Sequence, residues 1–164
     1  MKFCLIVIFV LSLSGQVLGQ TDSLNEFRVS GLKLAYTYSA LNNIELGYGI
    51  GKLIPVREMI GPAGYYGGFI NMGYGFQNNT SLLTSKISYE LMTVLIGTRL
   101  SLVNYTDFDQ DQITFLPEIG LTYNALISLM YGYNLHLTGN KFDVNTHSFS
   151  ISIIPYWKEK DWKK

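Results

Sequence analysis

The chain has 164 residues, and its 12 Lys/Arg are matched by 12 Asp/Glu, so it carries no net charge. This length suits one domain, and the lack of a basic surplus argues against a nucleic-acid partner, which requires a basic face. The 12 Tyr, 9 Phe and 16 Gly favour many strands and tight turns.

Residues 1–19 predict a secretory signal peptide that is cleaved. Lys2 precedes the apolar run FCLIVIFVLSLS, and small residues suited to a cleavage site, Val17 and Gly19, lie just before Gln20. The alternative is an uncleaved membrane anchor, for which this run is short. Cys4 lies at the start of the run, whereas a lipidated Cys should follow it, so lipidation is not expected and the mature chain has no cysteine chemistry.

Alternating apolar and polar residues predict eight β-strands and no helix in the rest of the chain. The predicted strands are 27–39, 44–51, 65–76, 82–90, 93–105, 113–123, 127–137 and 147–156. Residues 52–64 contain two prolines and are interpreted as a long irregular segment. No Gly, Pro or Asn separates the fourth strand from the fifth, so one long strand and a total of seven stays possible.

Strands of this kind without helices suit a closed antiparallel barrel or a sandwich. In a soluble barrel the apolar faces point inward, whereas in a membrane barrel they meet lipid and the polar faces line the interior. The polar faces here hold three positive and three negative charges among many small residues. Eight strands leave a narrow interior in which buried charges must be paired. The predicted interior charges are Lys33, Glu45, Lys86, Glu90, Arg99 and Glu118.

We interpret this charge set as a structural ion-pair lattice, with a polar pore or a proton-linked site as the alternative. The opposite faces of the strands are rich in Tyr, as expected of aromatic girdles at the level of lipid headgroups. The predicted lipid-facing residues include Leu129, Tyr131, Tyr133, Leu135, Phe149 and Ile151.

Residues 113–153 resemble the C-terminal strands of small outer-membrane β-barrel proteins of Bacteroidota-type bacteria. The segments PEIGL, YGYN and HSFSISI carry most of the resemblance, and KISYEL and NYTDF add weaker similarity. The resemblance implies an outer-membrane barrel inserted by the barrel-assembly machinery, and it marks no active site. Such barrels usually end on an aromatic residue; here Tyr156 and Trp157 close the last strand, and a charged tail, 158–164, follows.

The acidic segment DFDQDQ begins like a calcium loop, with Asp107, Asp109 and Asp111 at alternate positions. An EF-hand requires Gly at its sixth position, which here is Gln112, so we expect a hydrated surface loop and only weak candidate metal ligands. The two histidines, His136 and His147, are too few for a metal site. Motifs for a nucleophile, a phosphate loop or a dinucleotide are absent from the sequence.

The sequence therefore predicts an all-β chain with a single closed antiparallel up-and-down transmembrane β-barrel of about eight strands over residues 20–157. We expect a plugged polar interior, no catalysis, no cofactor, an outer-membrane location and a structural or loop-mediated role. The alternative is a soluble periplasmic or extracellular lipocalin-like barrel that binds a small apolar ligand. A barrel enzyme acting on lipid is a third class, and no residue constellation supports it.

Overall fold

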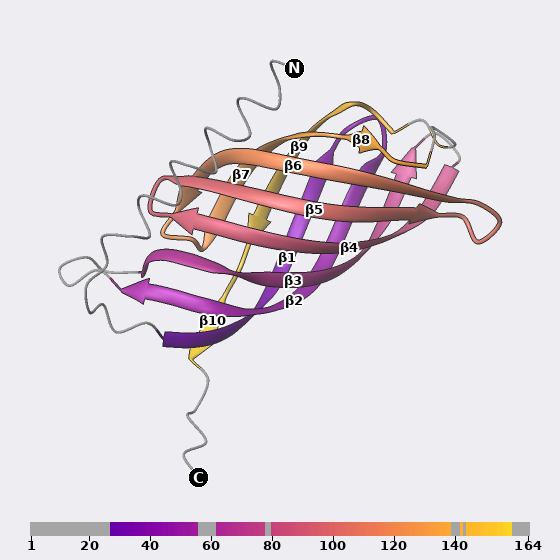
Figure 1. The fold of residues 1–164 in the computed structure, drawn as a ribbon. Helices are drawn as coiled ribbons and strands as arrows, with labels where there is room; N and C mark the ends of the chain where they lie inside the picture. Colours follow the sequence, from indigo (N-terminus) through magenta and orange to yellow (C-terminus); the bar gives the residue numbers. More distant parts are fainter. Residues whose placement is uncertain (1–26, 56–61, 78–79, 139–141, 143, 159–164) are drawn as a thin grey trace, which may run out of the picture.

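The computed structural model describes residues 27–55, 62–77, 80–138, 142 and 144–158, which form one β-barrel (Figure 1). The predicted signal peptide, and the charged tail beyond residue 158, lie outside the described residues. The strands are β1 (Phe27–Tyr38), β2 (Asn42–Pro55), β3 (Pro62–Gln77), β4 (Thr80–Thr93), β5 (Ile96–Thr106), β6 (Asp111–Tyr123), β7 (Ile127–Tyr133), β8 (Leu135–His136), β9 (His147–Ile153) and β10 (Tyr156–Lys158).

Neighbouring strands pair antiparallel in sequence order, and β9 pairs with both β7 and β1, which closes the sheet into a barrel. The short β8 continues β7 along β6, and β10 continues β9 along β1. The ten labelled strands are therefore eight barrel strands, two of which are interrupted. The expected all-β, antiparallel, up-and-down barrel is confirmed.

The fourth and fifth predicted strands are separate, so the count is eight rather than seven. A tight turn joins Thr93 of β4 to Ile96 of β5, and the Thr93 hydroxyl both accepts from the Ile96 N–H (3.0 Å) and donates to the Ile96 carbonyl (2.7 Å). Asn124 and Ala125, with φ of 50° and 55°, form the equally tight β6–β7 turn. Such paired positive φ angles match the twist of a hairpin.

The prediction that 52–64 is one long irregular segment is wrong at both of its ends. Residues 52–55 belong to β2 and residues 62–64 to β3, and their register continues from Lys52 opposite Tyr66 to Ile54 opposite Gly64. The prolines are tolerated because they lie at the strand ends, where a missing backbone donor costs little. Residues 56–61 lie outside the described residues.

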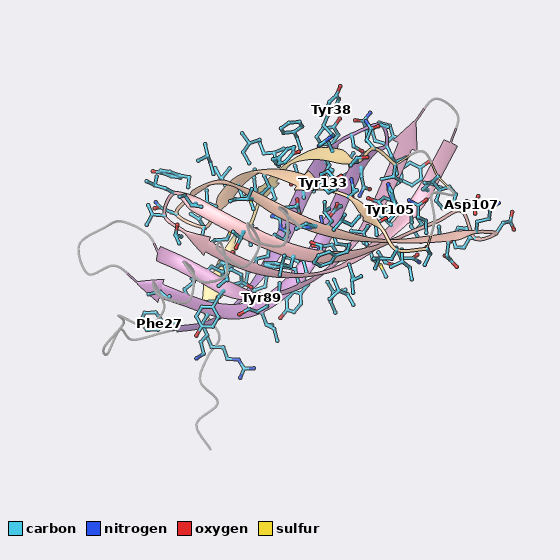
Figure 2. The ribbon with its side chains drawn as sticks, turned by 45° about the horizontal axis from the view of Figure 1, so that its top comes forward. Phe27, Tyr38, Tyr89, Tyr105, Asp107 and Tyr133 are labelled. Carbon is cyan, nitrogen blue, oxygen red and sulfur yellow. The ribbon has the colours of Figure 1, made fainter. Side chains whose placement is uncertain are left out.

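The barrel has two distinct ends (Figures 1 and 2). The terminal end holds the start of β1, the end of β2, β10, and the β4–β5 and β6–β7 turns. The loop end holds the β1–β2, β3–β4 and β5–β6 connections and the segment between β8 and β9. In Figure 2, Phe27 lies at the terminal end and Asp107 at the opposite, loop end.

Three layers of side chains fill the interior. An apolar cluster lies toward the terminal end, and a second apolar cluster lies toward the loop end; charged and polar residues occupy the middle. The terminal cluster consists of Val29, Tyr65, Phe69, Met92, Ala125, Met130 and Ile154. The loop-end cluster consists of Leu41, Leu82, Val103, Tyr105, Leu116 and Val144.

Glycines on the inward faces make room for these large side chains. A Cβ atom at Gly49 would collide with the Phe69 ring, and one at Gly51 or Gly67 would collide with Tyr65. Each large ring therefore lies over a neighbouring strand that lacks side-chain atoms at that point. This pairing of large with small residues accounts for glycine inside an interior as narrow as that of eight strands.

Candidate functional site: the charged interior and the apolar outer face

The six predicted interior charges all lie inside the barrel, and each is at most 5% exposed. All six lie on the inward-facing parity of their strands, where positions recur every second residue. Their contacts form a chain of alternating sign, in the order Lys33, Glu90, Arg99, Glu118, Lys86 and Glu45. A polar interior with a salt-bridge network, as the sequence predicts, is confirmed.

Arg99 on β5 lies at the centre of this chain. Its Nε lies 2.7 Å from Glu90 Oε1, and its Nη1 lies 3.1 Å from Glu118 Oε1. Lys33 on β1 also contacts Glu90 Oε1 and thereby connects β1 with β4, two strands that are not neighbours in the sheet. Two cations thus share the Glu90 carboxylate, which offsets the cost of removing that carboxylate from water.

Serines from β7 and β9 complete the surroundings of Arg99. Its Nη2 donates to Ser128 (3.4 Å) and Ser152 (3.3 Å), and its Nη1 donates to Ser150 (3.4 Å). Ser150 in turn donates to Glu118 at 2.9 Å. One guanidinium therefore joins four barrel strands besides its own, which suits its fixed fork of five donors.

Lys86 and Glu45 form the other half of the chain. Lys86 Nζ lies 3.4 Å from Glu45 Oε2 and 3.7 Å from Glu118 Oε2. Glu45 Oε1 also accepts from Asn43 (3.0 Å) and Thr37 (3.4 Å). Glu45 is consequently fixed by side chains from three strands, and its charge is balanced within the interior.

Sequence reasoning missed the two apolar layers that flank these charges. Phe69, Met130 and Leu82 are each at most 2% exposed and point inward. All three lie on the inward-facing parity of their strands; Phe69, for example, alternates with Gly67 and Asn71. Their inward-facing parity could have identified these residues from the sequence. The prediction of a polar interior considered only the polar residues of that parity.

Large apolar side chains cover the outer face of every long strand. The six residues predicted to face lipid all point outward; five are 37% to 54% exposed, and Tyr133 is partly exposed. The most exposed aliphatic residues of the strands are Ile70, Met72, Ile87 and Leu121, at 64% to 68%. Among the side chains that the structure describes, the exposed charged ones are Arg28, Lys52, Asp107, Asp109 and Asp111, all at strand ends or in the β5–β6 loop.

Tyrosine hydroxyls on the outer face find partners near the loop end. Tyr74 donates to Ser81 at 2.6 Å and Tyr36 donates to Asn42 at 3.1 Å. The Tyr131 hydroxyl lies 2.6 Å from His147 Nδ1. Each ring therefore has an apolar body on the outer face and a polar tip toward the rim, where Figure 2 shows Tyr38 pointing outward.

The Asp107 carboxylate stabilises the acidic β5–β6 loop to which it belongs. Asp107 Oδ1 accepts the backbone N–H groups of Asp109 (3.1 Å) and Gln110 (2.8 Å), and Asn104 donates to Asp111 at 3.3 Å. Across the part of the chain that the structure describes, no group of three or more His, Cys, Asp or Glu is placed to hold a metal ion.

The two histidines lie in different hydrogen-bonding environments. His136 Nδ1 lies 3.0 Å from Gln112 Nε2 and 3.4 Å from Thr114 Oγ1. His147 instead stacks on Tyr131, with ring centroids 5.9 Å apart. Neither of these histidine contacts supplies the serine and carboxylate partners of a nucleophilic triad.

Comparisons with known proteins add no family to this description. No protein-family model matches the chain, and neither curated proteins nor solved structures give a match. The described part of the chain contains no helix that could span a bilayer.

Proposed function

We propose that this chain is an integral outer-membrane β-barrel with a sealed interior, and that it acts as a membrane-embedded support for the connections at its loop end. One observation carries the proposal: large apolar side chains cover the outer face of the barrel, whereas its ion pairs lie inside. Water-soluble barrels have the reverse arrangement, because apolar surface is driven inward by water. A lipid solvent accounts for the apolar outer face.

The dimensions of the strands suit a bilayer. β1 has 12 residues, so its length is about 40 Å and its rise at the usual tilt is about 30 Å. This rise exceeds the ~25 Å apolar band of an outer-membrane barrel. The exposed charged side chains that the structure describes lie at the ends of the strands and in a loop, as a transmembrane orientation requires.

The same observations weigh against a soluble barrel that binds an apolar ligand. Such a barrel needs an apolar cavity, whereas the middle of this interior contains Lys33, Glu90 and Arg99 in mutual contact. If this barrel were soluble, its outer face would also expose to water an apolar surface far larger than that of single-chain soluble proteins.

The layered interior supports a sealed barrel rather than a pore. Apolar side chains lie on both sides of the charges along the barrel axis. An ion entering from either end would have to displace packed rings such as Phe69 or Tyr105, each at most 7% exposed.

The connections at the loop end support a role in loop-mediated interactions. The β5–β6 hairpin extends beyond the rest of the barrel (Figure 1), and its tip presents Phe108 with 84% exposure. The outer-membrane location draws on the predicted signal peptide and on the sequence resemblance, which also implies the barrel-assembly machinery as a partner. We propose no catalytic activity, since the histidines contact an amide, a threonine and a phenol.

The test is fractionation of cells that produce the full chain. We expect the protein in the outer-membrane fraction, resistant to carbonate washing, soluble only in detergent and faster-migrating on gels before heating than after. Purified protein in a planar bilayer should give no steady conductance. Complete release by carbonate without detergent would overturn the membrane assignment, and stable channel currents would overturn the sealed interior.

A further inference from the structure

We propose that the interior of the barrel contains a binding site for one water molecule, between Ser88 of β4, Ser101 of β5 and the second carboxylate oxygen of Glu90. The inference concerns the inside of the barrel and does not depend on whether lipid or water surrounds the outside. It makes a bound water part of the structure of the charged interior.

Two buried serines face each other across β4 and β5 without a hydrogen bond. Ser88 and Ser101 lie directly opposite each other on the inward faces of their strands and are 3% and 1% exposed. Neither hydroxyl has a hydrogen-bond partner among the described residues. A buried hydroxyl without a partner loses the free energy of its hydration, and the large majority of buried polar side-chain atoms in native proteins bond to protein or to ordered water. A ligand between the two hydroxyls would satisfy both.

The inward serines of β7 and β9 show how the chain itself satisfies such hydroxyls. The Ser128 and Ser152 hydroxyls lie 2.6 Å apart, and both accept from Arg99 Nη2. Ser150 donates to Glu118 at 2.9 Å. Ser88 and Ser101 differ from these three serines because they need a partner that the described residues do not supply.

The Glu90 carboxylate provides a third partner and restricts the chemistry of the ligand. Its Oε1 is shared by Lys33 and Arg99, whereas its Oε2 is buried and has no hydrogen-bond partner among the described residues. Glu90 and Ser88 are inward positions two residues apart, about 7 Å along the strand, which a water hydrogen-bonded on both sides can span. An ionised carboxylate only accepts hydrogen bonds, so the ligand must be a donor.

Charge balance favours water over an ion. The interior holds three buried cations and three buried carboxylates, so an added ion would leave one charge uncompensated away from solvent. An anion would also lie against Glu90, and a metal cation would compete with Lys33 and Arg99 for the same carboxylate. Water carries no charge and makes about three hydrogen bonds at a typical buried site, which is the number of partners available here.

The sign of a change in stability tests the site. The full chain, folded in detergent micelles, is unfolded with urea, and its folding equilibrium constant is compared with those of Ser88→Ala, Ser101→Ala and the double variant. With water bound, either single substitution releases the water and leaves the other hydroxyl and Glu90 without a partner, so the constant should fall by about fivefold or more. The double variant should lose no more than one single variant, because both substitutions remove the same water.

Ser85→Ala is the matched control, since Ser85 lies on the exposed outer face of β4, and its constant should change by less than about twofold. If either inward substitution instead raised the constant, that hydroxyl would be an unsatisfied group in the native barrel and the inference would be wrong. Losses that add in the double variant would equally contradict a shared water.

Pulsed X-ray radiolysis locates the ligand by a second measurement, since it forms hydroxyl radicals from water at its binding site. Phe69 lies opposite Ser88 and is 1% exposed, so radicals from bulk solvent do not reach its ring. Mass spectrometry should detect oxidised Phe69 in the unsubstituted barrel and not in the double variant; an unoxidised Phe69 in the unsubstituted barrel would overturn the inference. If replacing sodium by choline in the buffer destabilised the unsubstituted barrel and not the double variant, the ligand would be a metal cation and the water assignment would be wrong.

Discussion

Arg99 and Glu118 lie directly opposite each other on β5 and β6, and Arg99 Nη1 donates to both carboxylate oxygens of Glu118, at 3.1 and 3.3 Å. Arg99 is 1% exposed and Glu118 is 5% exposed, so bulk water cannot solvate either charge. Removing one partner of a buried ion pair leaves the other charge uncompensated. The resulting loss of stability is far larger than the net stabilisation that the intact pair contributes.

Replacing Arg99 by Met should therefore destabilise the barrel by about 3–5 kcal/mol. The substitution removes the cation shared by Glu90 and Glu118, and the serine hydroxyls of β7 and β9 lose their common donor. The free energy of unfolding in urea, measured on the barrel folded into vesicles, reports this loss.

Arg99→Lys is the matched control for the charge itself. A lysine keeps the positive charge but lacks the planar fork that reaches Ser128 and Ser152 together, so its loss of stability should be smaller than that of Arg99→Met. Equal stability of Arg99→Met and the unsubstituted protein would show that the interior carboxylates are neutral and that the chain of ion pairs is not formed.

The Lys86–Glu45 contact predicts measurable coupling between two strands that are not neighbours. Lys86 on β4 lies 3.4 Å from Glu45 on β2, with β3 between them. Lys86→Met should be strongly destabilising, and Glu45→Gln in addition should recover part of the loss, with a coupling energy of about 0.5–3 kcal/mol. Additive losses in the double-mutant cycle would contradict direct contact.

Gly49→Ala should be destabilising by about 1–3 kcal/mol because the new methyl group enters the space of the Phe69 ring. Gly68→Ala is the matched control, since its Cβ would meet only the Ser88 carbonyl oxygen at 3.7 Å, an ordinary contact. Introducing Gly49→Ala into a Phe69→Ala background should cost almost nothing. A similar loss in both backgrounds would place the strain elsewhere than at the ring.

The all-β barrel and the charged interior could be predicted because both follow from alternation along each strand, whereas the choice between seven and eight strands stayed open because no Gly, Pro or Asn separates the fourth strand from the fifth. Lys33 and Glu45, for example, lie on the polar parity of β1 and β2, and both are buried. The partners of each charge could not be predicted, since Lys33 meets Glu90 only after the barrel has closed and its register is set. Alternation specifies which face a side chain takes, whereas closure specifies what it meets.

The extents of β2 and β3 could not be predicted for a different reason. Proline is a strong local signal against strand structure, and residues 52–64 contain two. The backbone nevertheless continues its ladder up to Pro55 opposite Pro62 because the neighbouring strands supply partners. Pairing across the sheet thus outweighs the local signal, as it commonly does for β-strands.

A charge on the outer face separates the membrane proposal from the soluble alternative. Ile151 is 48% exposed on β9, where it lies between Leu129 of β7 and Tyr36 of β1. If this face meets acyl chains, Ile151→Arg should lower the free energy of unfolding in vesicles by about 2–4 kcal/mol. Phe108→Arg, at an exposed loop tip, should change it by less than about 0.5 kcal/mol. If the face instead met water, Ile151→Arg would also be nearly neutral and would raise solubility without detergent, so the difference between the two variants decides which solvent surrounds the barrel.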